Sequence, residues 1–277
     1  MATPTTPQLT ITLLGATGRT GREVLSGLLK RDIHHLKIYV RSKQKLINLF
    51  PQLLSDTRVE ICEGEVTNQE TMQACLSGAK IIINTIGGYS FFPDGSLQRA
   101  AESIVMALQG LRNNARTDGR KWEKPRMLLL SSSSRNERFA AARPKLVHWL
   151  IETAFQNGYN DLKLAHKAVL VDPSLVSVLF VQPGVLIEEE ATGSYISTEE
   201  VKLACSYEDL GAAFVDLALE RGYDELREVG VSSELGNRAA RYAPIMLRKI
   251  AAGFFAAYVP GALHITNFLE GVQRLIW

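Results

Sequence analysis

The chain has 277 residues, which is enough to bury one sizeable hydrophobic core, and we expect a single domain. Hydrophobic residues make up 46% and charged residues 22%, a balance that excludes the disordered, fibrous and membrane-embedded classes. The formal net charge of +2 comes from charges dispersed along the chain, so we expect no nucleic-acid partner. Cys62, Cys75 and Cys205 lack C-x-x-C spacing and predict neither a disulfide framework nor a zinc site. Because the N-terminus has no signal-peptide pattern, a cytoplasmic location is expected.

Apolar runs of strand length alternate with helical patterns along most of the chain. We expect strands at Leu9–Leu14, Leu36–Val40, Val59–Cys62, Lys80–Ile86, Met127–Leu130 and Leu175–Val181. We expect helices at Arg19–Arg31, Lys43–Leu54, Asn68–Leu76, Leu97–Ala115, Pro144–Gln156, Tyr159–Val171 and Tyr207–Arg221. Strands such as Ile81-Ile82-Ile83 are continuously apolar, which is typical of a sheet covered on both faces. The sequence therefore predicts an α/β fold, a Rossmann-type doubly wound parallel sheet with helices on both faces.

The C-terminal part is predicted to be a helical extension. We expect residues 1–237 to form the cofactor-binding domain with its substrate pocket and residues 238–277 to cap it. Two amphipathic patterns in the cap are separated by Pro260-Gly261, which interrupts a helix. Ile250–Leu269 contains no charged residue of the Asp, Glu, Lys or Arg type, but the Pro-Gly break argues against a membrane span. We expect the cap to pack on the body or on a second subunit, which leaves a homo-oligomer open, and we do not expect membrane association.

A glycine-rich turn follows the first predicted strand and opens the first predicted helix. Its sequence is Gly15-Ala16-Thr17-Gly18-Arg19-Thr20-Gly21. Gly15 suits the tight turn, Gly18 lets the backbone approach a pyrophosphate, and Gly21 allows close helix-to-strand packing. The N–H groups at the helix start then face the phosphates. The turn predicts a dinucleotide site that includes Thr17, Arg19 and Thr20, against the alternative of an ordinary glycine-rich connection.

The end of the second predicted strand carries Arg41 and Ser42, where NAD-selective proteins place an acidic residue. A guanidinium can form bidentate, charge-assisted hydrogen bonds to a 2′-phosphate, whereas a carboxylate would repel it. Arg41 and Ser42 therefore favour NADP(H), and Lys45 is an additional candidate. The alternative for Arg41 and Lys45 is a solvated side chain with no ligand.

With these motifs, the chain resembles the atypical short-chain dehydrogenase/reductase superfamily, specifically its NmrA-like group and the fungal averufin-oxidase-like proteins of secondary metabolism. The resemblance extends from residue 9 to about residue 235. Its segments are Gly15–Gly21, Arg41-Ser42, Gly64–Thr67, Asn84–Gly88, Ser131–Ser134, Tyr159–Leu162 and Val181–Gly184. The resemblance implies that Glu65 and Val66 border the adenine, and that Thr85, Ile86 and Gly87 border the ribose and nicotinamide. It also implies that Pro183, Gly184 and Val185 close over the nicotinamide.

The reductases of this superfamily use a Ser to polarise the carbonyl, a Tyr to deliver the proton, and a Lys to lower the pKa of that Tyr. Tyr159 and Lys163 lie four residues apart and would share a helix face, and Ser133, with Ser132 as second choice, ends a predicted strand. The alternative is a packed Tyr159 beside a solvated Lys163. Because Asn157-Gly158 precedes it, Tyr159 is expected at the start of its helix.

Two further features concern ligands. Glu188-Glu189-Glu190 clusters carboxylates, but consecutive side chains point in different directions, so no metal is predicted. The loop from Gly87 to Pro93 follows a strand at its carboxyl end, and its aromatic residues predict an apolar substrate wall, joined by Trp149, Phe155 and the Ile187–Tyr195 loop. The alternative for these aromatic residues is core packing.

Three functions are compatible with the sequence. The first is an NADPH-dependent oxidoreductase acting on a carbonyl or quinone-like group of a small apolar, aromatic secondary metabolite. The second is an NADP-binding redox sensor without turnover, and the third is an isomerase or cyclase on the same fold. The fold does not decide among them.

Overall fold

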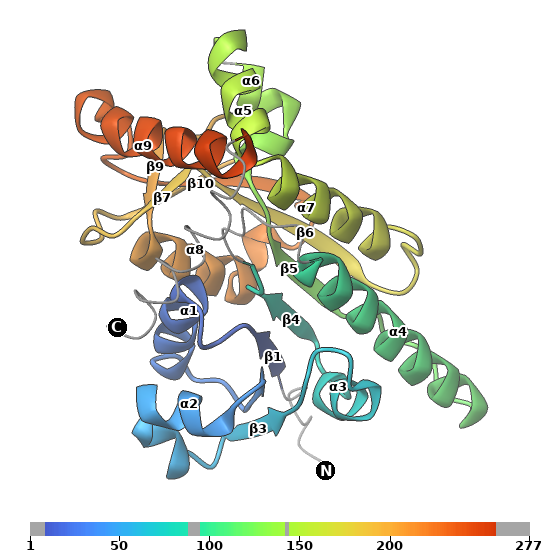
Figure 1. Cartoon of the computed structure of the whole chain (residues 1–277). Coiled ribbons are helices and arrows are strands. Elements are labelled where there is room, and N and C mark those ends of the chain that lie inside the picture. The colour runs from blue at the N-terminus through green and yellow to red at the C-terminus, as the bar shows by residue number, and fades with distance from the viewer. Residues whose placement is uncertain (1–8, 88–94, 142–143, 259–277) are drawn as a thin grey trace.

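A mostly parallel sheet of eight strands runs through the protein (Figure 1). The computed structural model describes residues 9–87, 95–141 and 144–258. The strands lie in the order β3-β2-β1-β4-β5-β6-β10-β8, and β8 pairs antiparallel with β10. Their bounds are β1 Thr10–Leu14, β2 His35–Val40, β3 Val59–Glu63, β4 Ile81–Asn84, β5 Arg126–Leu130, β6 Ser177–Pro183, β10 Glu228–Ser233 and β8 Ser194–Ser197. Successive strands are added to one side of β1 as far as β3, and from β4 onward to its other side. The order of strands therefore reverses between β1 and β4, and ligands bind at the carboxyl edge beside such a switch point. The predicted Rossmann-type fold is confirmed.

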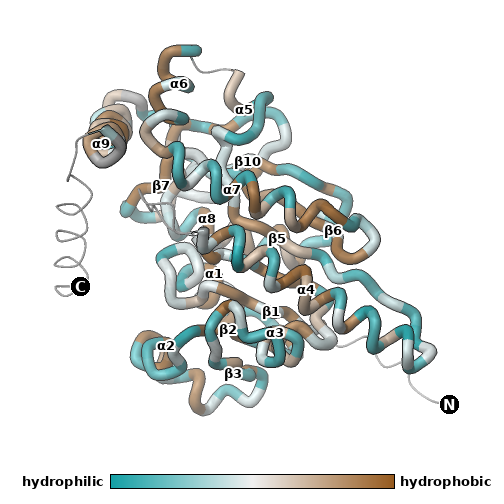
Figure 2. Tube along the Cα trace, turned by 45° about the vertical axis from the view of Figure 1, so that its right-hand side comes forward, coloured by the Kyte–Doolittle hydropathy of each residue, from teal (hydrophilic) through white to brown (hydrophobic). Residues whose placement is uncertain are grey.

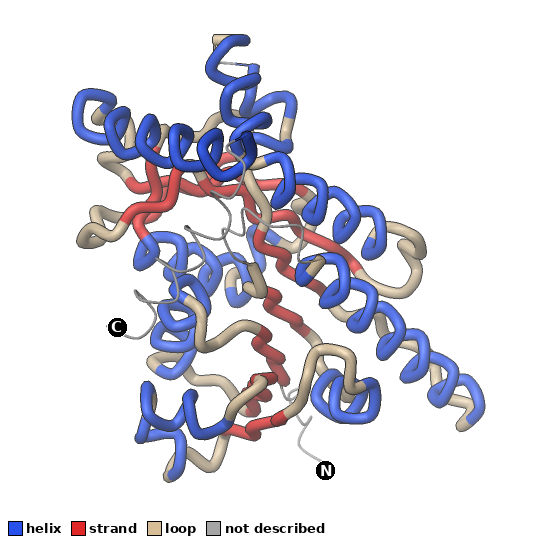
Figure 3. The backbone as a smooth tube through the Cα atoms, in the orientation of Figure 1, coloured by secondary structure: helices blue, strands red, loops and turns tan. Residues whose placement is uncertain are grey.

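Helices cover both faces of this sheet (Figure 3). On one face, α1 (Arg19–Leu29), α2 (Lys43–Leu49) and α8 (Tyr207–Leu219) bury their apolar residues against the strands. On the other face lie α3 (Gln69–Leu76), α4 (Ser96–Thr117) and α7 (Gln156–Val169). Figure 2 shows α4 alternating between hydrophilic and hydrophobic residues, as expected for a helix with one face on the core. The two faces explain the continuously apolar strands, because Ile82 enters one core and Ile83 the other.

Some predicted boundaries are wrong for identifiable reasons. The predicted helix Lys43–Leu54 divides into α2 and a 3₁₀ helix at Pro51–Leu54, because Pro51 lacks an N–H and forces Phe50 out of the helical region. Helix α7 begins at Gln156 and continues through Gly158, so Asn157-Gly158 does not delay the helix. The predicted strand Leu175–Val181 is displaced two residues toward the C-terminus.

Four strands were not predicted. Strand β10 pairs parallel with β6 inside the main sheet, and β8 follows it at the edge. Strands β7 (Val185–Ile187) and β9 (Ala204–Ser206) form a separate parallel pair. They are short or polar, as in the serines of β8 and β10, so they lack the continuous apolar run that identifies the six predicted strands.

The first of the two predicted C-terminal helices is α9 (Ala239–Tyr258), which packs on the β7–β9 pair and on a helix. Near its start, Tyr242 and Ile245 contact β7 and β9, and further along Ile250 packs on α6 (Lys145–Ala154). The short helix α5 (Glu137–Ala141) precedes α6. The second C-terminal pattern, after Pro260-Gly261, lies outside the described residues. Among the described helices, none is long and apolar enough to cross a bilayer.

Candidate cofactor and active site

The glycine-rich turn has the backbone geometry that its spacing predicts. Gly15 has φ +87°, and a Cβ there would lie 2.8 Å from Thr85 Oγ1. A Cβ on Gly21 would lie 2.0 Å from the carbonyl oxygen of Gly15, so only glycine fits at this crossing. Gly18 is the extended N-cap of α1 and donates its N–H to Gly15 O at 2.9 Å. Because no side chain caps α1, its first N–H groups suit an anion such as a pyrophosphate.

The residues between the glycines differ in exposure. Thr20 is buried, whereas Thr17 is half-buried and Arg19 is exposed. Arg19 forms an ion pair with Glu188, and its guanidinium lies 5.8 Å from the ring centre of Tyr207. The structure therefore places Arg19 at the first residue of α1, with a carboxylate already beside it.

Arg41 leaves the sheet next to this turn. Leu14 of β1 pairs with Tyr39 of β2, and Arg41 follows two residues later. The Arg41 side chain is exposed and makes no hydrogen bond or ion pair with the described residues. Ser42 caps α2 by accepting a hydrogen bond at 3.2 Å from the N–H of Lys45, whose side chain is exposed. Arg41 is thus available to a ligand at the carboxyl edge.

The segment predicted to border the adenine is fixed through its backbone. Tyr39 Oη donates to the carbonyl oxygen of Glu65 at 2.7 Å, and Ser103 Oγ donates to that of Val66. Burial raises the pKa of Tyr39 to about 12, so the phenol keeps its proton as a donor. The Glu65 side chain is exposed.

The segment after β4 lies against the glycine turn, and its predicted contact with the ribose and nicotinamide stays a prediction. Thr85 Oγ1 donates to Leu14 O at 2.8 Å, and the N–H of Ile86 is bonded to Asn84 Oδ1 at 3.0 Å. A Cβ on Gly87 would meet no atom closer than 3.7 Å, so this glycine is not required by packing. The remainder of the predicted aromatic wall, residues 88–94, lies outside the described residues.

Pro183, Gly184 and Val185 join β6 to β7. A Cβ on Gly184 would lie 2.6 Å from the carbonyl oxygen of Lys202, and Val185 N donates to Leu203 O at 2.8 Å. The close packing of this segment on residues 202–203 therefore explains the glycine. Its predicted contact with the nicotinamide stays a prediction.

The predicted catalytic residues lie at the neighbouring part of the carboxyl edge. Tyr159 is in the first turn of α7, half-buried among apolar residues of α6 and α9, with its ring 6.3 Å from that of Phe155. Lys163 lies one turn further along α7 and is exposed. Ser133 is 2% exposed in a 3₁₀ helix, and Ser132 Oγ caps that helix through the N–H of Ser134.

A serine–histidine pair in this region was missed from the sequence. Ser131 Oγ and His166 Nε2 are 3.0 Å apart, and the His166 ring lies 4.1 Å from that of Phe180. Burial, with a smaller contribution from Arg135, lowers the pKa of His166 to about 4, so its imidazole is neutral at physiological pH. Since 35 residues separate the pair, spacing alone could not reveal it.

Asp161 lies in Tyr159–Leu162, one of the segments that carry the family resemblance. Its two carboxylate oxygens accept hydrogen bonds of 2.9 Å from the N–H groups of Leu97 and Gln98. Asp161 of α7 therefore caps α4, directly after the loop that leaves β4. Its part in the motif is to fix the two helices together.

An apolar hollow of about 520 Å³ lies between α6 and the end of α9. Trp149 and Phe255, both exposed, line it with Phe254, Tyr258 and Thr153. It shares no residue with the glycine turn, so we do not assign it to the cofactor. Trp149 thus belongs to this surface, whereas Phe155 contacts Tyr159.

Comparison with known proteins identifies the family. A family model described as NAD(P)H-binding matches residues 15–221. Oxidoreductase stcQ of Emericella nidulans is 31% identical over 79% of this chain and 81% of that protein, and oxidoreductase ordB of Dothistroma septosporum is 28% identical over 92% and 94%. A short-chain dehydrogenase/reductase of Veillonella parvula in complex with NADP has the same fold, with a TM-score of 0.62 at 19% identity over 83% of this chain and 96% of that one. The chain therefore belongs to the NAD(P)H-binding, NmrA-like family of atypical short-chain dehydrogenases/reductases.

Proposed function

We propose that the protein is an NADPH-dependent oxidoreductase that acts on a carbonyl or quinone-like group of a small apolar, aromatic secondary metabolite. The observation that carries the choice of cofactor is Arg41, an exposed cation beside the glycine turn that has no partner among the described residues. The substrate class is supported by the similarity to fungal oxidoreductases. It is also supported by the apolar surroundings of Tyr159.

The nicotinamide cofactor supplies a hydride when bound. The start of α1 would hold the pyrophosphate, because its N–H groups have no side-chain cap. Arg41 would bind the 2′-phosphate through charge-assisted hydrogen bonds. The segments Glu65-Val66 and Thr85–Gly87 would border the adenosine and the nicotinamide ribose.

Hydride transfer to a carbonyl also requires a proton, for which two groups compete. Tyr159 has a phenol at the start of α7, but Lys163 is exposed and Tyr159 is packed among apolar rings. Ser131 has a hydroxyl bonded to the neutral imidazole of His166. In the tautomer with a protonated Nε2, the imidazole donates to Ser131 Oγ and leaves the hydroxyl proton for a substrate oxygen. We favour Tyr159 as the proton donor and keep Ser131 as the alternative.

A second candidate function is an NADP-binding sensor without turnover. It is favoured by the exposure of Lys163, because water screens an exposed ammonium and weakens its effect on the pKa of a neighbouring tyrosine. A non-redox isomerase or cyclase would retain the same pocket.

The deciding experiment measures NADPH oxidation with a panel of hydroxyanthraquinones and aromatic ketones. The oxidoreductase proposal expects turnover with at least one compound. The turnover rate of Tyr159→Phe should be lower by about a hundredfold to ten-thousandfold, with unchanged NADPH affinity. If Tyr159→Phe keeps full turnover and Ser131→Ala loses it, the proton comes from Ser131. Tight NADPH binding without turnover of any compound would favour the sensor. The compounds tested should include the metabolite that is made by the enzyme of a neighbouring biosynthetic gene.

A further inference from the structure

The three consecutive glutamates after β7 have different partners in the fold. Glu188 forms an ion pair with Arg19, at the first residue of α1. Glu189 accepts hydrogen bonds from Arg241 Nε at 2.9 Å and Tyr242 Oη at 3.2 Å, both on α9. Glu190 is exposed. The loop thus links the cofactor turn to the C-terminal helix, and only Glu188 of the three reaches the turn.

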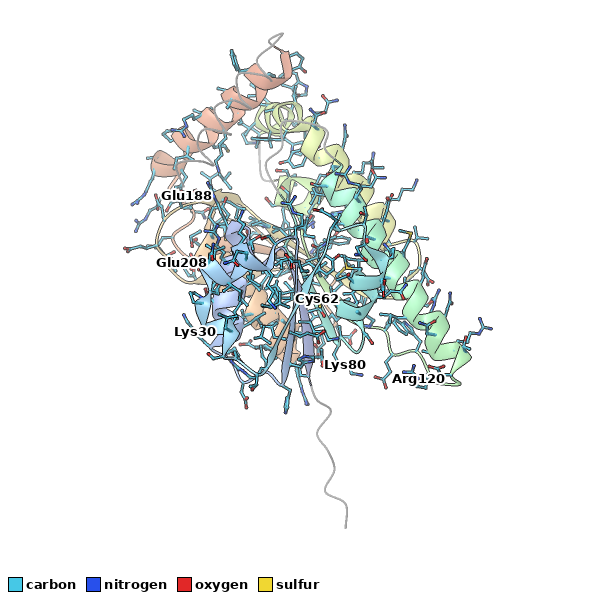
Figure 4. The ribbon with its side chains drawn as sticks, turned by 60° about the horizontal axis from the view of Figure 1, so that its bottom comes forward. Lys30, Cys62, Lys80, Arg120, Glu188 and Glu208 are labelled. Atoms are coloured by element: carbon cyan, nitrogen blue, oxygen red, sulfur yellow. The ribbon has the colours of Figure 1, made fainter. Side chains whose placement is uncertain are left out.

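Glu188, labelled in Figure 4, interacts electrostatically with cations from two different elements. Arg19 forms the ion pair with Glu188. Lys249 of α9 donates to the carbonyl oxygen of Leu186 at 2.8 Å and interacts electrostatically with Glu188. Burial lowers the pKa of Lys249, Arg19 lowers it further, and Glu188 opposes both effects. The carboxylate therefore has a second cation near it if it leaves Arg19.

The position of Glu188 matters because of what else binds at the start of α1. Gly18 caps this helix without a side chain, and the first turn of α1 contains no acidic residue. In this fold the pyrophosphate of the cofactor binds there. The Glu188 carboxylate and the pyrophosphate are both anions, and both are suited to the guanidinium of Arg19.

The pair between Arg19 and Glu188 is easy to exchange. The two side chains are 67% and 65% exposed, and exposed ion pairs contribute little to stability. A carboxylate that stayed in place would also repel the incoming phosphates.

We propose that Glu188 competes with the cofactor pyrophosphate for Arg19, and so sets the affinity and the salt dependence of cofactor binding. Binding is then an exchange of anions at the start of α1. This inference rests on the proposed placement of the pyrophosphate at the start of α1, where Arg19 is the first residue. Glu188 then lowers the affinity for the cofactor, a role that its position in an acidic loop does not suggest.

The test compares Glu188→Gln with Glu190→Gln by titrating each full-length protein with NADPH at low and at high salt. Both variants remove one negative charge from the same loop, so long-range electrostatics changes similarly in both. Glu188→Gln should bind NADPH about three- to tenfold more tightly at low salt, and this gain should shrink at high salt. Glu190→Gln should change the affinity less than about twofold.

A double-mutant cycle separates this inference from the proposed site. Arg19→Met should weaken NADPH binding. Adding Glu188→Gln to Arg19→Met should give a clearly smaller gain than Glu188→Gln gives in the unmutated protein, because the competition for the shared cation is absent and only the repulsion of the phosphates remains. If Arg19→Met binds NADPH as the unmutated protein does, the placement of the pyrophosphate is wrong. If Arg19→Met weakens binding but Glu188→Gln and Glu190→Gln behave alike, the placement stands and the competition is refuted.

Discussion

The carboxyl edge of the sheet has two parts, one formed mainly by backbone groups and the other mainly by side chains. Around β1, β2 and β4, the site consists of backbone: glycines at 15, 18 and 21, the uncapped start of α1, and carbonyl groups fixed by buried donors. Around β5 and β6, it consists of polar side chains such as the buried Ser131 and the half-buried His166, next to an apolar cluster formed with α9. A backbone site can bind a constant cofactor, whereas a site of side chains can vary with the substrate.

The largest effect we expect lies in the side-chain part and follows from the neutral state of His166. Its pKa is lowered from 6.5 to about 4 in the fold, so the unfolded chain binds a proton at a higher pH than the folded protein does. Stability from this group is therefore fully present above about pH 6.5 and is lost as the pH falls toward 4. The loss is on the order of 3 kcal/mol.

Urea unfolding measured between these pH values checks this expectation. His166→Gln should remove most of the pH dependence, whereas His34→Gln, which changes an exposed histidine, should retain it. If the free energy of unfolding falls equally steeply with pH in the unmutated protein and in His166→Gln, the fold does not hold His166 in its neutral form.

We expect a smaller effect from substituting one glycine in each part, which tests whether the two parts act separately. A Cβ on Gly21 would lie 2.0 Å from Gly15 O, and one on Gly253 would lie 2.5 Å from Ala154 O. Overpacking typically costs about 1–3 kcal/mol. Gly21→Val should therefore weaken NADPH binding by about tenfold to a hundredfold, whereas Gly253→Val should displace α9 from α6 at nearly unchanged NADPH affinity.

The matched control for both is Gly222→Val, because a Cβ at Gly222 meets no atom within 4 Å. Calorimetry gives the affinity, and hydrogen exchange of the α9 amides reports its docking. A loss of NADPH affinity in Gly253→Val as large as that in Gly21→Val would mean that the two parts of the edge do not act separately.

The same division explains how much the sequence could predict. The six strands β1 to β6, the glycine turn and the position of Arg41 follow from local patterns, because continuous apolar runs and glycine spacing are visible within a few residues. Strand β10 was missed because its side chains are partly polar, although both neighbours bury it in the sheet. The contact of Asn136 with Gln182 and Glu228 joins residues 46 and 92 positions apart, so it appears only after the fold brings three segments together.

Cofactor preference tests the central claim most directly. If Arg41 binds the 2′-phosphate, calorimetry should show that the unmutated protein binds NADPH at least about tenfold more tightly than NADH, since hydrogen bonds to charged groups contribute about 1.5–3 kcal/mol. Arg41→Asp should abolish or reverse this preference, while Lys43→Asp, the same charge change at a neighbouring exposed residue, should largely preserve it. Equal affinity of the unmutated protein for NADPH and NADH would contradict the assignment of Arg41 and, with it, the proposal of an NADPH-dependent protein.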